Sequence, residues 1–320
     1  MSRIVVFSDP HVHPFRAFSV NNSRLMNSVN VIRDVFREAH ARGVKTVFFC
    51  GDMNQEHGKI DTWVINLLTD VFQEMHDQYP DIVVYGISGN HDHKWKNTLD
   101  NPAPSALLAL EKALPEVFIL WDNCGDTVED IYLCGIPYYE FPEDFYAVLD
   151  KMVASIPKGK RVVLLMHQTP SGSIDPIPSQ INPKDNRFEK FHLVLNGHIH
   201  RHQWFGNNFT TVGSPLQQDL GDIGQEKGIL YADMDKQPFA ELEHIPLSYP
   251  QFRRLKFGDA IPKAWENDYI LFDPPPTEEQ QMADVDRFGA NNSPRDIVQA
   301  YGEHSRLEQE IINVGLTLLT

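Results

Sequence analysis

Cysteine is scarce in this sequence, with only Cys50, Cys124 and Cys134 among 320 residues. Three thiols do not make a disulfide framework, so the fold must be stabilised by its core, in a reducing setting. Long hydrophobic runs are also missing, because none approaches the ~18 apolar residues of a membrane span. The start, Met1-Ser2-Arg3-Ile4, has no signal-peptide pattern. We therefore expect a cytoplasmic protein with no membrane partner.

Positive charge is in deficit as well. Lys and Arg number 28 against 44 Asp and Glu, which gives a net charge of −16. This balance argues against a broad basic surface for nucleic acid, so any DNA contact should be local or supplied by a partner. The Walker pattern Gly-x-x-x-x-Gly-Lys-Ser/Thr is absent too, so any ATP hydrolysis would belong to another subunit. Hydrophobic residues make up 42% of the chain, enough for a sizeable core.

Polar clusters follow several apolar, strand-like runs. The central one is Gly89-Asn90-His91-Asp92, which comes directly after the run Ile82–Ile87. Four other runs end in the same way: Ile4–Phe7 before Asp9 and His11, Val47–Cys50 before Asp52, Val162–Met166 before His167, and Leu193–Leu195 before His198 and His200. Five predicted strands therefore each end in a potential metal ligand.

These residue types suit a pair of divalent metal ions. Carboxylate and amide oxygens bind hard cations, and imidazole suits borderline ions such as manganese, iron or zinc. Asp9 and His11 are spaced i, i+2, as are His198 and His200, so in extended backbone each pair presents both side chains on one face. Two metals ~3.5–4 Å apart clamp the attacking and leaving oxygens of a phosphoryl transfer.

The order of these motifs resembles the calcineurin-like metallophosphoesterase superfamily, from Asp9 to His200. A narrower resemblance comes from the segments Val212–Gln218 and Gln225–Gly228. They are similar to SbcD-type nucleases, the counterparts of the meiotic-recombination-eleven DNA repair nuclease. This resemblance implies a Mn²⁺-dependent exonuclease or endonuclease subunit, which hydrolyses phosphodiester bonds at DNA ends in repair, recombination or replication.

The resemblance also implies roles for the ligands. One metal would be bound by Asp9, His11 and His200, and the other by Asn90, His167 and His198. Asp52 would bridge the two ions. Mn²⁺ is the ion expected, with Mg²⁺, Fe or Zn as possible replacements.

His91 and Asp92 are the catalytic candidates. The resemblance assigns such a histidine to the phosphate, where it would stabilise charge or protonate the leaving oxygen. Asp92 would either orient the His91 ring or cap the loop. Related nucleases often place a second histidine three residues after the bridging aspartate, but here that position is Gln55. Either His57 takes its place from a shifted loop, or the second histidine is absent.

The segment Lys94-Trp95-Lys96 follows the central motif closely and could hold a DNA backbone and stack a base, or could be an ordinary exposed loop. Two alternatives to a DNA nuclease share the same ligands. One is a phosphoesterase or phosphatase acting on a small molecule or protein, although Gly51–Gln55 lacks the Asp-Arg-Gly of protein phosphatases. The other is a catalytically weak DNA-end tether, which Gln55 keeps open.

The periodicity predicts an α/β fold in which two mixed β-sheets pack as a sandwich flanked by helices, with a short C-terminal helical appendage. Helices are expected at 25–39, 61–78, 106–114 and 141–155, and further strands at 117–120, 127–128, 131–135, 210–212, 228–234 and 239–245. The first two helices either cover the sheet alone or also form a homodimer, as the resemblance implies.

The expected divisions are a nuclease domain at 1–250, a reduced capping region with a Pro-rich linker at 251–285, and a helical tail at 293–320. The tail carries an apolar stripe of Leu307, Ile311, Val314 and Leu318. Such a stripe needs a surface to bury against. By resemblance, that surface would be the coiled coil of an SbcC-like ATPase subunit.

Overall fold

The structure is a computed structural model, and it describes residues 3–57, 59, 61–173, 178–206, 208–235, 241–256 and 258–273. The chain divides into two compact units, Met1–Gln251 and Phe252–Thr320, and each is described by itself. The predicted tail and its four apolar residues lie outside the described part of the chain, so the predicted ATPase contact stays a prediction. No described helix is long and apolar enough to cross a membrane.

The first sheet has six strands and contains the beginning of the chain. Its order is β12 (Glu241–Pro246), β11 (Gly228–Asp233), β1 (Arg3–Phe7), β2 (Thr46–Phe49), β3 (Val83–Gly86) and β4 (Phe118–Leu120). Strands β1 to β4 run parallel, whereas β11 and β12 are antiparallel to their neighbours. The carboxyl ends of β1, β2 and β3 therefore emerge at the same edge.

The second sheet is also six-stranded and mixed. Its order is β5 (Cys124–Val128), β6 (Ile131–Ile136), β7 (Arg161–Met166), β8 (Leu193–Asn196), β10 (Phe209–Thr211) and β9 (Gln203–Trp204). The four central strands are parallel, and the two edge strands β5 and β9 are antiparallel. The carboxyl ends of β7 and β8 thus also share one edge.

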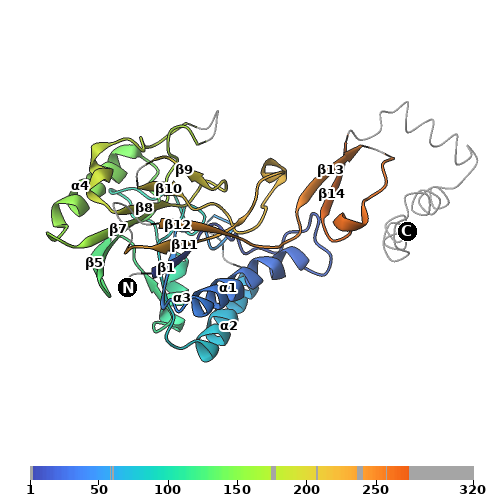
Figure 1. Cartoon of the computed structure of the whole chain (residues 1–320), viewed down its shortest axis with the longest axis horizontal. Helices are drawn as coiled ribbons and strands as arrows, with labels where there is room; N and C mark the ends of the chain where they lie inside the picture. The colour runs from blue at the N-terminus through green and yellow to red at the C-terminus, as the bar shows by residue number, and fades with distance from the viewer. Residues whose placement is uncertain are drawn as a thin grey trace, which may run out of the picture. The chain divides into compact units, whose positions relative to one another are not determined.

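Alternation along the strands packs the two sheets into layers. In β1, Ile4 and Val6 belong to the core between the sheets, while Val5 and Phe7 belong to the core under the helices. Helices α1 (Ser23–Ala41), α2 (Thr62–Gln78) and α3 (Leu107–Ala113) cover the outer face of the first sheet, and α4 (Pro142–Ser155) covers the second (Figure 1). The predicted α/β sandwich of two mixed sheets is confirmed.

Local signals account for where the helices begin. Asp61 caps α2, because its carboxylate accepts a hydrogen bond from the backbone N–H of Trp63. Pro142 opens α4, and Glu143 and Asp144 place negative charge in its first turn.

The side chain of Trp63 is exposed at the start of α2. The homodimer expected from these helices stays a prediction.

Two strands were not predicted. β9 has only two residues, too few to produce a pattern, and it pairs with β10 at the edge of the second sheet. In the second unit, β13 (Phe252–Lys256) pairs in parallel with β14 (Tyr269–Asp273), although only the second had an apolar, strand-like sequence. Three of the five residues of β13 are charged, because the strand lies in a two-stranded sheet with little to bury.

Candidate dimetal centre

The predicted ligands from five strand ends meet in one place. Within the described residues, three groups of ligand atoms lie within 4.8 Å of one another. These groups are Asp9, His11 and His200; His11, Asp52 and His91; and Asp52, His167 and His198. His11 and Asp52 each occur in two groups, so the groups form one continuous cluster. Residues separated by up to 191 positions are thus brought together by the shared sheet edges.

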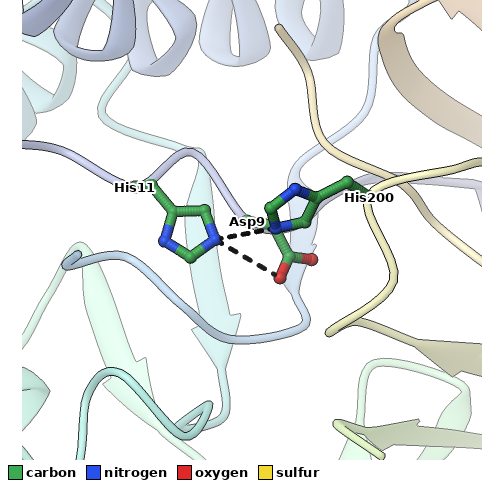
Figure 2. A group of neighbouring side chains, drawn as sticks. All are labelled: Asp9, His11 and His200. Carbon is green, nitrogen blue, oxygen red and sulfur yellow. Dashed lines mark hydrogen bonds and ion pairs between the residues drawn. The ribbon is translucent and has the colours of Figure 1, made fainter. Parts of the chain in front are cut away.

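The first ligand group is formed by Asp9, His11 and His200. The Nε2 atoms of His11 and His200 are 3.0 Å apart, and His11 Nε2 lies 3.9 Å from Asp9 Oδ1 (Figure 2). At least one of two facing neutral ring nitrogens must offer a lone pair. The three side chains therefore present acceptor atoms to a common point, as a cation site requires.

The second ligand group lies around Asn90. Its Oδ1 atom is 3.1 Å from His167 Nε2 and 2.9 Å from His198 Nδ1. His167 Nε2 is also 3.2 Å from Asp52 Oδ2. An amide oxygen, a carboxylate and two imidazoles thus converge, which is the mixed ligand set predicted for one of the ions.

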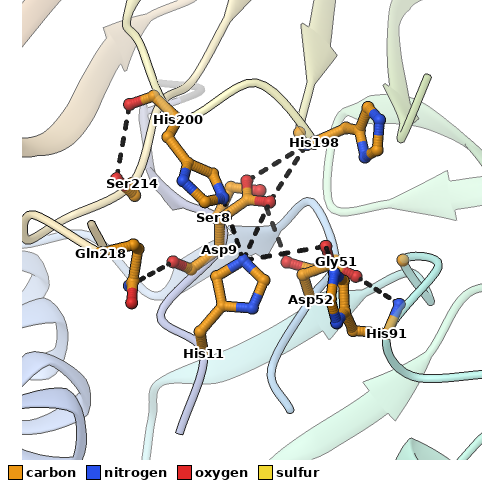
Figure 3. Close-up of polar contacts among 12 residues, drawn as sticks. Ser8, Asp9, His11, Gly51, Asp52, His91, His198, His200, Ser214 and Gln218 are labelled. Atoms are coloured by element: carbon orange, nitrogen blue, oxygen red, sulfur yellow. Dashed lines mark hydrogen bonds and ion pairs between the residues drawn. The ribbon is translucent and has the colours of Figure 1, made fainter. Parts of the chain in front are cut away.

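Asp52 lies between the two groups. Its Oδ2 atom is 3.2 Å from His167 Nε2, 3.8 Å from His11 Nε2 and 4.0 Å from His91 Nε2 (Figure 3). Among the described contacts, Asp52 is the only carboxylate of the cluster that lies near rings of both groups. The other oxygen, Oδ1, accepts a hydrogen bond from the backbone N–H of His91 at 2.8 Å. This position is the one that a bridging ligand would occupy.

The contact with His167 separates the pKa values of the two buried aspartates. Burial raises the pKa of Asp9 to about 7, although His167 nearby lowers it. Burial would also raise the pKa of Asp52, but the charge and hydrogen bond of His167 outweigh it and hold that pKa well below its usual range. Asp52 therefore carries the stable negative charge of the cluster.

The histidines are mostly held neutral. Burial lowers the pKa of His198 to about 3, and burial also lowers the pKa values of His11 and His200. His167 differs: burial opposes its protonation, but Asp52 outweighs burial and raises its pKa to about 9. Metal ligands must be deprotonated, so three of the four rings are already in the binding form, and a cation would displace the proton of His167.

The residues present fit two divalent cations. Each group combines oxygen and imidazole nitrogen donors, and Asp52 can serve both. Metal binding would relieve the crowding of acceptor atoms between His11 and His200.

The backbone that carries the ligands is unusual. Asp9, His11, Asp52 and His198 all have positive φ angles, of 54°, 45°, 60° and 73°. Residues with a Cβ rarely adopt this left-handed conformation, and outliers of this kind gather at functional sites. Gly89 permits the closest approach, because a Cβ there would lie 2.1 Å from Asp52 Oδ1.

Asp92 binds backbone rather than the His91 ring. Its Oδ2 accepts hydrogen bonds from the N–H groups of Gly89 and Asp52, at 3.0 and 2.8 Å, and its Oδ1 accepts from Asn54. Of the two roles predicted for Asp92, these contacts correspond to loop capping, and no described hydrogen bond joins its carboxylate to the His91 ring. The orienting role stays a prediction. Asp92 ties the loop after β2 to the loop after β3, which carry Asp52 and Asn90.

His91 is oriented by the loop after β2. Its Nδ1 hydrogen-bonds to the carbonyl oxygen of Gln55, and its ring stacks on His57 with centroids 4.0 Å apart and planes 29° apart. The structure thus answers which residue stands beside the catalytic candidate: His57 does so with its ring, and Gln55 contributes only its backbone. His57 is held in turn by Asn90, whose carbonyl oxygen is 3.0 Å from His57 Nδ1.

A network behind His200 was not predicted residue by residue. Buried Lys227 donates to the carbonyl oxygen of His200 at 2.6 Å and to Asp222 Oδ1 at 2.8 Å. Gln218 Nε2 donates to the carbonyl oxygens of Asp9 and Pro10 at 3.1 and 3.2 Å (Figure 3). The signal was present in the sequence, since Gln218 and Lys227 lie in the two segments, Val212–Gln218 and Gln225–Gly228, from which the narrower resemblance was predicted.

The predicted DNA-contact segment lies on the surface. Trp95 is exposed, and the ammonium group of Lys94 lies 5.9 Å from the centroid of its ring. Lys96 forms an ion pair with Glu140, so part of its charge is already compensated. The segment follows the Asn90 loop directly, which keeps it near the metal centre.

Comparison with known proteins assigns the class. A model of the family described as calcineurin-like phosphoesterase matches residues 2–202. The chain therefore belongs to the calcineurin-like phosphoesterase family, whose members are metal-dependent hydrolases. This shows the predicted superfamily and its metal-dependent phosphoester chemistry.

Similar folds occur among solved structures. A putative 5'-nucleotidase from Staphylococcus aureus, in complex with alpha-ketoglutarate, is 12% identical to this chain, with a TM-score of 0.42. The match covers 89% of this chain and 58% of that protein. The chain thus spans little more than half of that protein. A dimetal phosphatase from Danio rerio is also 12% identical with a TM-score of 0.44, and covers 72% of this chain and 91% of its own. No curated protein matches the sequence significantly.

Proposed function

We propose that this chain is a Mn²⁺-dependent phosphodiesterase of the SbcD type, which cleaves DNA at its ends. The observation that carries the proposal is the place of the segment Val212–Gln218 in the structure. Gln218 hydrogen-bonds to the backbone of the Asp9 loop, and the N–H of Ser214 donates to the carbonyl oxygen of His200 at 3.0 Å. The segment with the nuclease resemblance is therefore a structural part of the metal centre.

The side chains of the cluster divide the chemistry between them. Asp9, His11 and His200 would hold one ion, and Asn90, His167 and His198 the other, with Asp52 between them. When bound, such a pair of ions supplies charge stabilisation for the attacking and leaving oxygens of the phosphate. The protein positions these ligands on loops that are tied to two rigid sheets.

His91 is the proton-transfer candidate. A carbonyl oxygen can only accept, so the hydrogen bond to Gln55 places a hydrogen on Nδ1. Nε2 is then the atom that faces the centre, 4.0 Å from Asp52 Oδ2, and the side chain is partly exposed. From there Nε2 can accept a proton in the neutral ring, and in the protonated ring it can stabilise the charge of a phosphate oxygen or protonate the leaving group, effects worth ~10²–10⁴-fold.

The decisive experiment compares substrates in Mn²⁺. We expect the wild-type chain to shorten linear duplex or single-stranded DNA and to hydrolyse p-nitrophenyl phosphate, a monoester, far more slowly. Asp52→Asn serves as the catalytic control, because it keeps the shape of the side chain and removes the charge. Rapid monoester hydrolysis without DNA cleavage would overturn the nuclease and favour the small-molecule alternative.

One observation favours that second candidate, a phosphoesterase acting on a small molecule. An open pocket of about 520 Å³ adjoins His91, a size typical of small-ligand sites. A phosphorylated metabolite would fill it without any DNA path along Lys94 and Trp95. The comparison of DNA with p-nitrophenyl phosphate separates the two candidates, because only a nuclease cleaves DNA.

A further inference from the structure

The pocket beside His91 is built by three loops. They follow β1, β2 and β3, which are parallel neighbours in the first sheet. The loops contribute His13 and Phe15, then Gln55, Glu56, His57 and Lys59, and finally His91. None of these residues except His91 was assigned a role with the substrate, and none is among the predicted metal ligands.

Backbone contacts fix the first two loops against each other. The N–H of His11 donates to the carbonyl oxygen of Asp52 at 3.2 Å, and the N–H of Val12 donates to that of Met53 at 2.8 Å. Val12 and Asn54 form an isolated parallel bridge. The pocket therefore keeps a constant position relative to the ligands that precede it in both loops.

An aromatic ring lines this pocket with a cation behind it. The guanidinium carbon of buried Arg24 lies 3.9 Å from the centroid of the Phe15 ring, and Arg24 is held by the carbonyl oxygen of Gln218 at 2.7 Å. His13 meets the Phe15 ring edge-on at 4.9 Å. Phe15 is thus held firmly by its neighbours, as a stacking platform for a planar group has to be.

The other lining groups favour an anion. Lys59 is positively charged, and the imidazoles of His13 and His57 can donate hydrogen bonds. The only carboxylate in the lining is Glu56, which is largely exposed and lies 4.0 Å from His13 Nε2. Lys59 offsets Glu56 in formal charge, so this pocket is not acidic although the chain carries a net charge of −16. Its contents should be negatively charged and partly aromatic.

We infer that this pocket binds the nucleoside phosphate unit adjacent to the scissile bond, with its base against Phe15 and its phosphate near Lys59 and His57. The inference rests on the proposed function, because it names the part of the substrate that a phosphodiesterase would recognise here. Stacking of a base on an aromatic side chain tolerates any base, so the pocket would recognise nucleotides without reading sequence.

A pair of chromogenic diesters tests how much the nucleoside contributes to substrate recognition. The p-nitrophenyl ester of thymidine 5'-phosphate and methyl p-nitrophenyl phosphate share their leaving group and differ in the nucleoside. The 3' isomer of the thymidine ester covers the opposite polarity. For the wild-type chain in Mn²⁺, we expect kcat/KM for one thymidine ester to exceed that for the methyl ester by on the order of tenfold or more.

Two variants then test the residues of the pocket. Phe15→Leu removes the platform but keeps an apolar side chain beside Arg24, and Lys59→Ala removes the charge. Phe15→Leu should lower the thymidine-to-methyl ratio several-fold, mainly through KM, and leave the methyl ester rate unchanged, because the methyl ester has no base. Lys59→Ala should lower kcat/KM for both esters and leave the ratio unchanged, because both esters carry the phosphate. Trp204→Leu and Lys158→Ala make comparable changes at exposed positions outside the pocket and should alter neither the ratio nor the rates.

The outcomes separate this inference from the proposed function. A wild-type ratio near one for both isomers, or a ratio that survives in Phe15→Leu, overturns the nucleotide pocket even if DNA is cleaved. Absence of DNA cleavage overturns the nuclease but leaves the pocket standing if the ratio is high and sensitive to Phe15. An unchanged methyl ester rate shows in the same assay that Phe15→Leu is folded and loaded with metal.

Discussion

The two ligand groups of the centre are supported differently. In the group of Asp52, His167 and His198, the His167 ring is fully buried, and its Nδ1 lies 2.6 Å from the carbonyl oxygen of Cys50. In the group of Asp9, His11 and His200, the His200 side chain is 27% exposed, and its Nδ1 is 3.9 Å from Asp222. One group is therefore fixed through side-chain rings, and the other mainly through backbone.

The two ligand groups are also supported by different parts of the chain. The support of His167 comes from strand-end loops within residues 2–202, the part that matches the family. The support of the group of Asp9, His11 and His200 comes from Gln218, which binds the Asp9 loop, and from Asp222 and Lys227 behind His200, and all three lie beyond residue 202. The part of the chain that matches the family therefore contains the support of the first group, and the segment after it contributes to the support of the second.

The largest expected effect comes from the residue that both groups share. Asp52→Asn keeps the shape of the side chain but removes the charge that lies near His11 and His167. We expect phosphoesterase activity to fall to background while the folded structure persists. Activity assays with circular dichroism as the check on folding measure this, and Asp81→Asn at an exposed position is the matched control. Full Mn²⁺-dependent activity would contradict the bridging role.

His91→Ala should slow turnover but leave the metal ions of both ligand groups bound. The ring faces Asp52 at 4.0 Å, but its predicted target is the phosphate. We expect kcat to drop by ~10²–10⁴-fold with two equivalents of metal retained. Metal analysis alongside kinetics tests this, with the exposed His40→Ala as control. Loss of one ion would make His91 a ligand.

Lys227→Met should weaken only one of the two sites. It removes the donor to the His200 carbonyl and leaves Asp222 buried without its cation. Outer partners of metal ligands typically contribute ~10–100-fold in affinity. Titration with Mn²⁺ should then resolve one unchanged and one weakened binding step. Lys45→Met, at an exposed surface ion pair, should leave both steps unchanged. Equal weakening of both steps would remove the distinction between the two groups.

The smallest effect is on the stability of the fold. Ions that bind only the folded chain stabilise it by about 2.7 kcal/mol when present at a hundred times their Kd. We expect Mn²⁺ to raise the Tm by several degrees and EDTA to reverse the rise. In Asp52→Asn the shift should shrink, because both sites lose a charge. A Tm that does not respond to metal in the wild type would contradict binding at this centre.

Most of the fold was accessible from periodicity. Apolar runs predicted the central strands within one or two residues, since strands buried on both faces have continuous hydrophobic sequences. The edge strand β9 and the charged β13 were not predicted, because short or solvent-facing strands do not produce a continuous apolar run. Pairing order was equally hidden: nothing in the sequence states that β1 pairs with both β2 and β11.

The site was predictable in its residues but not in its contacts. The ligands follow predictable strands, so the shared sheet edge could be anticipated from strand-end chemistry. The Asp92 contacts could not, because a carboxylate three residues after a glycine gives no sign of which N–H groups it meets. The same holds for His57, whose stacking on His91 depends on how the loop after β2 turns.

The left-handed backbone at Asp9, His11, Asp52 and His198 has a consequence for how related chains change. Such a position costs of order 1–3 kcal/mol for a residue with a Cβ, less for asparagine and aspartate, and glycine avoids the cost. A relative released from selection for catalysis would gain stability by exchanging these residues for Gly. Aspartate and histidine at the four positions would then be a record, readable from sequence alone, that a lineage still depends on its metal ions.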